Sequence, residues 1–140
     1  MIESKFHLNF YLKAQRKLWI WVLGMDLSKN WTLGKIADVS HGRLLTGKAT
    51  EPVKAISIDS RKVAQGELFW VIEGAYIDGN DFVHGAMASG AMGALISHQP
   101  SRPLPGTFPL ILTQKGIDAL LLLASAHRNL FPQVIAIGVT

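Results

Sequence analysis

The stretch IDSRKVAQGELFWVIEGAYIDG, residues 58–79, decides the fold because it places a polar cluster, an apolar run and two glycine turns side by side. The apolar run Leu68–Ile72 predicts a strand that is buried on both faces of a sheet. Gly66 lets the chain turn into this strand, and Gly74 and the pair Asp78-Gly79 bracket a three-residue loop after it. Ligands of α/β sheets bind where strands end, so we expect the binding site around this strand.

Three consecutive polar side chains precede the strand, and each supplies a different hydrogen-bonding group. Asp59 is an acceptor, Ser60 carries a hydroxyl, and Arg61 is a planar donor. The alternative is purely structural, namely two tight turns around a core strand, since Asp, Ser and Gly are common turn residues. The spacing of these residues leaves both interpretations open.

The composition is typical of one soluble globular domain: the chain has 140 residues, of which 49% are hydrophobic and 17% charged. The absence of cysteine from the sequence excludes disulfides and thiolate metal sites, and it suits a reducing compartment. The histidines have no spacing typical of metal ligands, so we expect no metal site and assign them to the surface or to turns. They are His7, His41, His84, His98 and His127.

The net charge of +4 is concentrated at the N-terminus. Residues 1–24 contain four basic side chains and one acidic one, whereas the rest of the chain is close to neutral. A nucleic-acid interface needs a basic stripe with stacking aromatic side chains, and the sequence after residue 24 shows no such stripe. We therefore expect no nucleic-acid partner.

The N-terminal segment leaves several interpretations open. Its longest apolar run, Leu18–Leu23, is far shorter than a membrane-spanning helix needs. A signal peptide and a helix lying on a membrane surface are the alternatives. We expect residues 1–24 to be an extension outside the fold, without a membrane partner.

The segment before the central stretch predicts one helix and two strands. Thr32 can cap a helix that ends at Gly42. The buried face of this helix is expected to contain Leu33, Ile36 and Ala37. Arg43–Thr46 and Val53–Ile58 predict short strands on either side of a turn.

The segment after the central strand predicts a βαβ unit. Asp81 can cap a helix that runs to Ser89, where Gly90 stops it. The inward face of this helix is expected to contain Phe82, Ala86 and Met87. Gly93–Ser97 predicts the next strand, which should be parallel to the first. The proline-rich segment 99–109 predicts a loop.

The remaining residues predict a strand, a helix and a last strand. Leu110–Thr113 and Val134–Thr140 are the apolar strands, and Pro132 ends the helix between them. The helical face is expected to contain Ile117, Leu120, Leu121, Ala124 and Arg128. The predicted fold is therefore α/β, with a βαβ unit and a mixed or mostly parallel sheet.

Three linked blocks of sequence resemble the N-terminal, UDP-binding domain of the Mur ligases of peptidoglycan synthesis. The blocks are Ser57, Asp59, Ser60 and Arg61, then Gly66–Phe69, then Gly74, Asp78, Gly79, Asp81 and Phe82. The opening WTLGKIA at residues 31–37, followed by GRL, is similar to the member that adds D-alanyl-D-alanine. The resemblance covers about residues 31–140 and implies a small Mur-ligase N-terminal domain at residues 25–133.

The resemblance implies that the chain binds the uridine-diphosphate end of a UDP-N-acetylmuramoyl-peptide for an ATP-dependent amide ligase in the cytoplasm. It carries the UDP contacts over to Ile58, Ser60, Arg61, Ala75, Tyr76 and Ile77. A hydroxyl and loop amides can hydrogen-bond uracil, and Tyr76 can stack on it or cover it. Arg61 has two expected roles, a phosphate contact or an ion pair with Asp59. We expect the protein to be a monomer.

The resemblance also places the catalysis outside this chain. In the family, a strand similar to Val134–Thr140 leads into a glycine-rich loop that wraps ATP phosphates, so this strand is expected to open a truncated central ATPase domain. The 140 residues contain no such loop. ATP and magnesium are therefore expected in the parent protein, and this fragment is expected to have no catalytic residue, metal or cofactor and to be inactive alone.

The chain departs from the family pattern at three places. Asn80 replaces the usual His, Trp70–Ile72 replaces a smaller run, and Thr113–Gly116 replaces a segment that caps the next helix. The same residues are also compatible with two alternatives. One is the ligase that adds the third amino acid, and the other is a stand-alone binding module for nucleotide sugars. A third alternative, a membrane-surface interaction protein, depends on the basic aromatic N-terminus.

Overall fold

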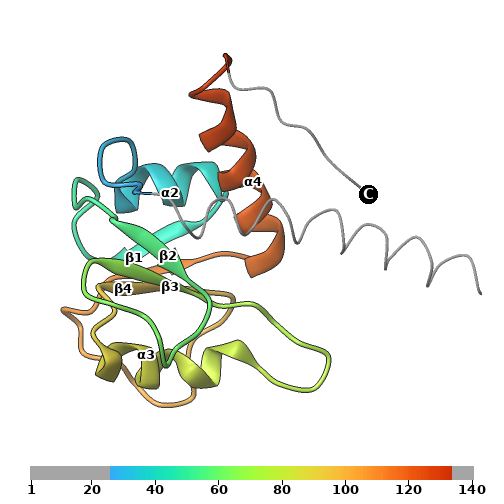
Figure 1. Cartoon of the computed structure of the whole chain (residues 1–140). Coiled ribbons are helices and arrows are strands. Elements are labelled where there is room, and N and C mark those ends of the chain that lie inside the picture. Colours follow the sequence, from blue (N-terminus) through green and yellow to red (C-terminus); the bar gives the residue numbers. More distant parts are fainter. Residues whose placement is uncertain (1–25, 134–140) are drawn as a thin grey trace, which may run out of the picture.

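The computed structural model describes residues 26–133, which form three layers (Figure 1). A five-stranded sheet lies between helices α2 (Leu33–Val39) and α4 (Gly116–Asn129) on one face and α3 (Val83–Ser89) on the other. The predictions for residues 1–24 and for Val134–Thr140 lie outside the described residues. Within residues 26–133, every helix is too short or too polar to cross a membrane.

The sheet is mostly parallel, as predicted, in the order β1-β5-β4-β3-β2. The strands are β1 (Arg43–Thr46), β2 (Ala55–Ser57), β3 (Glu67–Trp70), β4 (Gly93–Ile96) and β5 (Leu110–Leu112). β2 to β5 run parallel, whereas β1 pairs with β5 in the antiparallel direction. β1 has the predicted bounds, and the other four strands end one or two residues earlier than predicted.

Each face of the sheet has its own core. Leu68 and Trp70 of β3 pack with residues of α2 and α4, whereas Phe69 and the following Val71 pack with residues of α3. This alternation follows from the pleat of a strand, in which successive side chains point to opposite faces. The prediction of a strand buried on both faces is confirmed.

The helix of the βαβ unit begins differently from the prediction. A 3-10 helix, η1 (Gly79–Phe82), precedes α3, and Asp78 rather than Asp81 caps it by accepting a hydrogen bond from Asn80 N. The tighter winding of a 3-10 helix turns Phe82 outward, so its side chain is 45% exposed instead of buried.

The rest of α3 follows the prediction in part. Its buried residues are Val83 and Ala86, whereas Met87 is half-buried. Gly90 ends the helix with a left-handed φ of 108°, as expected for a glycine at this position. The strands β3 and β4 on either side are parallel, which confirms the βαβ unit.

Helix α2 has the predicted cap and the predicted buried face. The side chain of Thr32 accepts a hydrogen bond from the backbone of the first turn, and Leu33, Ile36 and Ala37 are buried. The helix ends at Val39, three residues before Gly42, because His41 takes the left-handed conformation, with φ 52°.

The buried face of α4 is rotated by one residue from the predicted face. It contains Gly116, Ala119, Leu120, Leu123, Ala124 and His127. Arg128, predicted on the buried face, is exposed, and Ile117 and Leu121 are half-buried. The run of four leucines at 120–123 fits either face, so periodicity alone does not determine the rotation.

His127 is buried, so its assignment to the surface or to turns was wrong. Its side chain is 1% exposed, and its Nδ1 accepts a hydrogen bond from Trp31 Nε1 at 2.8 Å. The bond joins the segment before α2 to the end of α4. Burial lowers the pKa of His127, because the charged imidazolium is poorly solvated there.

The stability of the fold should therefore depend on pH through His127. The folded state has the lower pKa, so it binds fewer protons than the unfolded state, whose histidine titrates near 6.5. The contribution of neutral His127 is present above this pH and is lost as the pH falls toward the folded pKa. We expect the gap in unfolding free energy between wild type and His127→Gln to shrink from pH 7.5 to pH 5.

Urea unfolding of both proteins across this pH range measures the gap. The comparison with His127→Gln is needed because His98, whose pKa is raised, contributes stability in the opposite direction. A gap that stays constant with pH would show that His127 does not titrate differently in the two states.

Candidate functional site

The predicted site residues lie at the carboxyl edge of the sheet, meaning the edge where parallel strands β2 to β5 end. β2 and β3 are neighbours, with Ser57 beside Phe69, so both end at this edge. Ile58–Arg61 directly follow β2, and Ala75–Ile77 lie in the loop after β3. The structure thus brings both predicted segments to the edge where α/β sheets bind ligands, although no hydrogen bond among residues 26–133 joins the two directly.

The turn after β2 is closed by hydrogen bonds of its own residues. Asp59 N donates to Ser57 Oγ at 3.3 Å, and Ser57 Oγ donates to Asp59 O at 3.1 Å. Arg61 Nε and Nη2 each lie 3.0 Å from a different carboxylate oxygen of Asp59. These hydrogen bonds from Arg61 lower the pKa of Asp59 to about 2 and raise the pKa of Arg61. The ion pair corresponds to one of the two roles expected for Arg61.

The side chains of this turn remain accessible despite the ion pair. The Arg61 side chain is 84% exposed, so the pair lies in water and contributes little to stability. Ile58 is 40% exposed and Ser60 is half-buried. Within the described residues, the Ser60 hydroxyl forms no hydrogen bond, which leaves it available to a ligand.

The loop after β3 projects from the sheet, in light green in Figure 1. One hydrogen bond closes its tip, from Gly74 N to Ile77 O at 3.1 Å. Ala75 is exposed, Tyr76 is 100% exposed and Ile77 is 61% exposed. An aromatic ring in this position adds no packing to the fold, but it offers a flat apolar face to a planar ligand.

Four polar residues at the carboxyl edge were missed by the sequence analysis as site residues. They are Asp78, Asn80, Ser97 and His98. Asp78 Oδ1 accepts from Asn80 Nδ2 at 2.7 Å, and Asp78 Oδ2 lies 2.5 Å from His98 Nε2. Hydrogen bonds from Asn80, and then from His98, lower the pKa of Asp78. The pKa of His98 is raised, first by its hydrogen bond with the Gln99 carbonyl and then by Asp78.

The sequence indicates only one part of this cluster, the turn at residues 78–80. An Asp-Gly-Asn sequence is typical of turns in which the Asp side chain accepts from the backbone two residues later. That bond is present, from Asn80 N to Asp78 Oδ1 at 2.9 Å. The partners on the other strand, Ser97 and His98, are 17 and 20 residues away from Asn80 and Asp78, so no local pattern predicts them.

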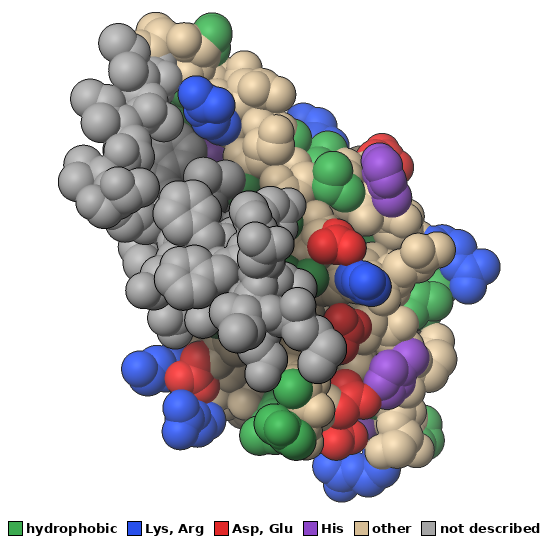
Figure 2. Space-filling model, turned by 90° about the vertical axis from the view of Figure 1, so that its right-hand side faces the viewer, with side chains coloured by type: hydrophobic (Ala, Val, Ile, Leu, Met, Phe, Trp, Pro, Cys, Tyr) green, Lys and Arg blue, Asp and Glu red, His purple; other side chains and the backbone are tan. Residues whose placement is uncertain are grey.

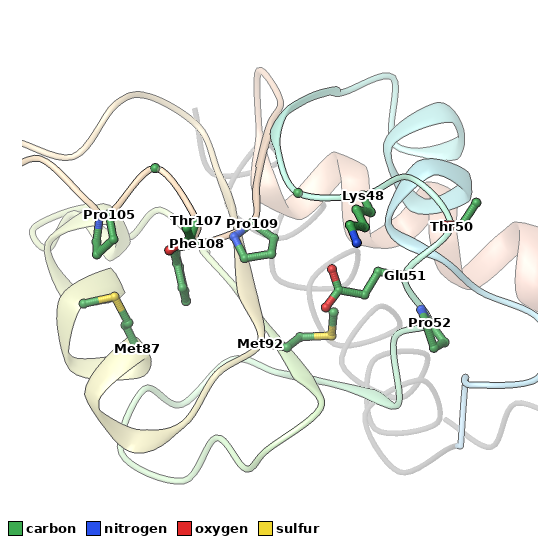
Figure 3. Close-up of a pocket in the computed structure, with 12 residues that line it drawn as sticks. Lys48, Thr50, Glu51, Pro52, Met87, Met92, Pro105, Thr107, Phe108 and Pro109 are labelled. Atoms are coloured by element: carbon green, nitrogen blue, oxygen red, sulfur yellow. The ribbon is translucent and has the colours of Figure 1, made fainter.

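A separate cavity of about 920 Å³ lies at the opposite edge of the sheet (Figure 3). The loop after β1 forms one wall, with Lys48 and Glu51, and Met87, Met92 and Phe108 form the apolar wall. It contains none of the predicted site residues. Since ligands of parallel sheets bind at the carboxyl edge, we place the candidate site there and not in this cavity.

The described residues do not fit ATP and magnesium. Gly47-Lys48 is the nearest approach to a phosphate-binding motif, but it lies in the loop after β1 and not between a strand and a helix. Within residues 26–133, the βα turn that opens the long helix α4, Thr113–Gly116, has neither a lysine after a glycine nor a capping side chain. No group of three or more potential metal ligands occurs within residues 26–133.

The face in Figure 2 carries charges of both signs. Basic side chains, in blue, and acidic side chains, in red, both lie on its described surface. A surface of this kind does not attract an anion by its general field. Recognition of a nucleotide at this edge would therefore depend on specific contacts, such as the Ser60 hydroxyl and the Tyr76 ring.

Comparison of the structure with solved proteins shows where this architecture occurs. MurF from Acinetobacter baumannii superposes with a TM-score of 0.63, covering 74% of this chain and 22% of that chain at 23% sequence identity. At this identity the likeness concerns the fold alone.

The sequence is also similar to that of curated enzymes. Over 113 residues it is 32% identical to the UDP-N-acetylmuramoyl-tripeptide--D-alanyl-D-alanine ligase of Treponema pallidum, covering 74% of this chain and 24% of that protein. The chain thus spans about a quarter of the length of this relative.

A second group of relatives has a different substrate in its name. The chain is 38% identical over 74 residues to the UDP-N-acetylmuramoyl-L-alanyl-D-glutamate--2,6-diaminopimelate ligase of Geobacillus kaustophilus, covering 53% of this chain and 14% of that protein. A family model described as Mur ligase family, catalytic domain, matches residues 52–126, which is more than half of the chain. The chain therefore belongs to the Mur ligase family of peptidoglycan synthesis.

Proposed function

We propose that this chain binds the uridine-diphosphate end of a UDP-N-acetylmuramoyl-peptide for an ATP-dependent amide ligase. The observation that carries the proposal is the joint position of Ile58–Arg61 and Ala75–Ile77 at the carboxyl edge of neighbouring parallel strands. The names of both relatives contain a UDP-N-acetylmuramoyl-peptide, which supplies the substrate class. In this proposal residues 25–133 form the UDP-binding domain, and the ATP-driven step takes place elsewhere in a cytoplasmic, monomeric enzyme.

Each segment has a distinct part in recognition. The Ser60 hydroxyl and the amides of Ala75–Ile77 can hydrogen-bond the carbonyls and the N–H of uracil, and the Tyr76 ring can stack on the base. Arg61 is exposed enough to reach a phosphate with N–H groups that its pair with Asp59 does not use. The apolar side chains of Ile58 and Ile77 border this surface.

We propose D-alanyl-D-alanine as the added group, because the opening WTLGKIA at residues 31–37 resembles the ligase that adds it. Match length does not decide between the two ligases: the chain matches the Treponema pallidum ligase over 113 residues and the diaminopimelate ligase of Zymomonas mobilis over 103. The diaminopimelate-adding ligase is therefore the second candidate. Assays of the complete enzyme with D-alanyl-D-alanine and with diaminopimelate, each with its own UDP-linked peptide, would distinguish the two; a stand-alone binding module would ligate neither.

We expect UDP to bind the chain and to shift the amide resonances of residues 58–61 and 75–77 in a titration followed by NMR. Ser60→Ala should raise the Kd about fivefold, because one neutral hydrogen bond contributes about 1 kcal/mol. Tyr76→Ala should raise the Kd about five- to 100-fold through lost stacking. Because Tyr76 is 100% exposed, its removal should leave the melting temperature unchanged.

Ser125→Ala, on the exposed side of α4, is the matched control and should bind UDP as the wild type does. ATP at the same concentration should leave both segments undisturbed. Resonance shifts centred on the cavity around Lys48 and Glu51 would place the nucleotide site there instead. An equal response to ATP would contradict a site for UDP.

A further inference from the structure

The loop after β3 is fastened to the end of β4 by one buried side chain. Asn80 is 1% exposed, and its Nδ2 donates to Ser97 Oγ at 2.9 Å and to Asp78 Oδ1 at 2.7 Å. Its Oδ1 accepts from Ser97 N at 3.2 Å. The amide group thus holds the loop on one side and the backbone of the neighbouring strand's end on the other.

These bonds use both donors of the Asn80 amide and its oxygen. A buried amide that loses such partners is destabilised, because water cannot replace them. His98 adds an outer contact to Asp78 Oδ2, so the Asp78 carboxylate is held through both oxygens. The connection therefore has a buried part at Asn80 and an exposed part at His98.

The tip of the loop has little else to hold it. Ala75, Tyr76 and Ile77 are all exposed, and within the tip one backbone hydrogen bond, from Gly74 to Ile77, closes the turn. Such a segment opens easily unless its ends are fixed. One end continues β3, and the other enters η1 directly at Asp78 and Asn80.

We propose that Asn80 is a positioning residue for ligand binding: by its hydrogen bonds to Ser97 and Asp78, it holds Ala75–Ile77 in one conformation over the carboxyl edge. The inference rests on the proposed nucleotide site for its functional meaning. A ligand that meets an already ordered loop does not have to order it on binding, so its affinity is higher.

The test combines loop order and UDP affinity in the full chain. In Asn80→Ala, the backbone order parameters of residues 75–77 should fall from about 0.85 to below about 0.6, while those of β3 and β4 stay high. The Kd for UDP should rise about tenfold. Asp81→Asn, one position further along and exposed, is the matched control and should change neither measurement.

Ser97→Ala provides a second variant in case Asn80→Ala folds poorly. It removes the hydroxyl that accepts from Asn80 Nδ2 and keeps the Ser97 N–H bond, so both effects should be smaller in the same direction. Adding Ser97→Ala to Asn80→Ala should then add almost nothing, because both changes break one connection.

Two outcomes overturn the inference. If Asn80→Ala lowers only the melting temperature and leaves the order parameters and the UDP affinity unchanged, Asn80 stabilises the fold without positioning the loop. If the loop loosens but UDP binds as before, the loop does not need positioning. If the wild-type chain does not bind UDP, the proposed function is rejected. The order parameters of the wild type and of Asn80→Ala then still show whether Asn80 holds the loop.

Discussion

Replacing Gly116 with alanine is expected to lower the free energy of unfolding by about 3 kcal/mol or more, and the melting temperature by more than about 10 °C. Gly116 is the first residue of α4, and a Cβ built there would overlap the carbonyl oxygen of Val71. The Cβ is fixed rigidly to the backbone of α4, and the carbonyl oxygen belongs to the backbone directly after β3, so neither can move without displacing one of these two elements. Chemical denaturation followed by circular dichroism measures the loss.

Gly85→Ala is the matched control, since it makes the same substitution in another helix. Beyond its chain neighbours and the backbone of its own helix, no atom lies within 4 Å of the position of its Cβ, and Gly85 is exposed in α3. Alanine is the better helix former, so this variant should gain up to about 1 kcal/mol. Equal changes in both variants would contradict the close contact between Gly116 and Val71.

Truncation of Trp70 to alanine should cost about 3–5 kcal/mol. Trp70 is 0% exposed and belongs to the core between the sheet and α2 and α4. Its Nε1 also donates to Gly116 O at 2.7 Å, which fixes the start of α4 against β3. The change therefore removes both a large buried volume and a bond between two elements.

Trp70→Phe separates these two contributions, because it keeps most of the ring volume and loses the donor. It should cost about 1–2 kcal/mol, and urea unfolding of both variants gives the comparison. A loss below about 1 kcal/mol in Trp70→Ala would contradict the packing described for this ring. Combined with Gly116→Ala, the loss should be smaller than the sum, since the two residues share one contact.

The strands could be predicted from the sequence, to within one or two residues at their ends, because their burial depends on neighbouring residues. The run from Leu68 is apolar at every position, which is typical of a strand covered on both faces, and Gly66 before it takes the expected positive φ of 84°. The same local information predicts β1 and the glycine end of α3. Because a βαβ unit makes its two strands parallel, the predicted order of elements also places the residues that follow the strands at the carboxyl edge of the sheet.

The choice between two similar capping residues could not be predicted locally. Asp78 and Asp81 are both suitable caps at the start of a helix. Asp78 caps η1, and its neighbour Asn80 is buried, because the end of β4 supplies Ser97 as a partner. That partner is known only once the strands are placed side by side.

The rotation of α4 relative to its predicted buried face also depends on hydrogen-bond partners from distant parts of the chain. Two tryptophan N–H groups, from Trp31 and Trp70, need acceptors inside the core. They find them at His127 Nδ1 and Gly116 O, near the two ends of α4. Both acceptors therefore lie on the buried face, although a helical pattern of apolar residues would not place a histidine there.

Two departures from the family pattern prove to be one feature. Trp70 stands in the larger apolar run, and Gly116 stands in the segment that lacks a capping side chain. The structure joins them through the bond from Trp70 Nε1 to Gly116 O. This bond holds the first turn of α4 against β3, although it satisfies none of the N–H groups that a capping side chain would accept from.

The order of the strands also determines when the fold can be completed during synthesis. Among residues 26–133, β1 precedes all other strands, yet its only neighbour in the sheet is β5, with Arg43 beside Leu112. At about 5–20 residues per second, a ribosome makes the roughly 70 residues between them in roughly 4 to 14 s. During this interval the nascent β1 has no strand of this sheet to pair with, and its unpaired edge is open to other chains. A chaperone that binds this segment before β5 is made would keep it from pairing with other chains.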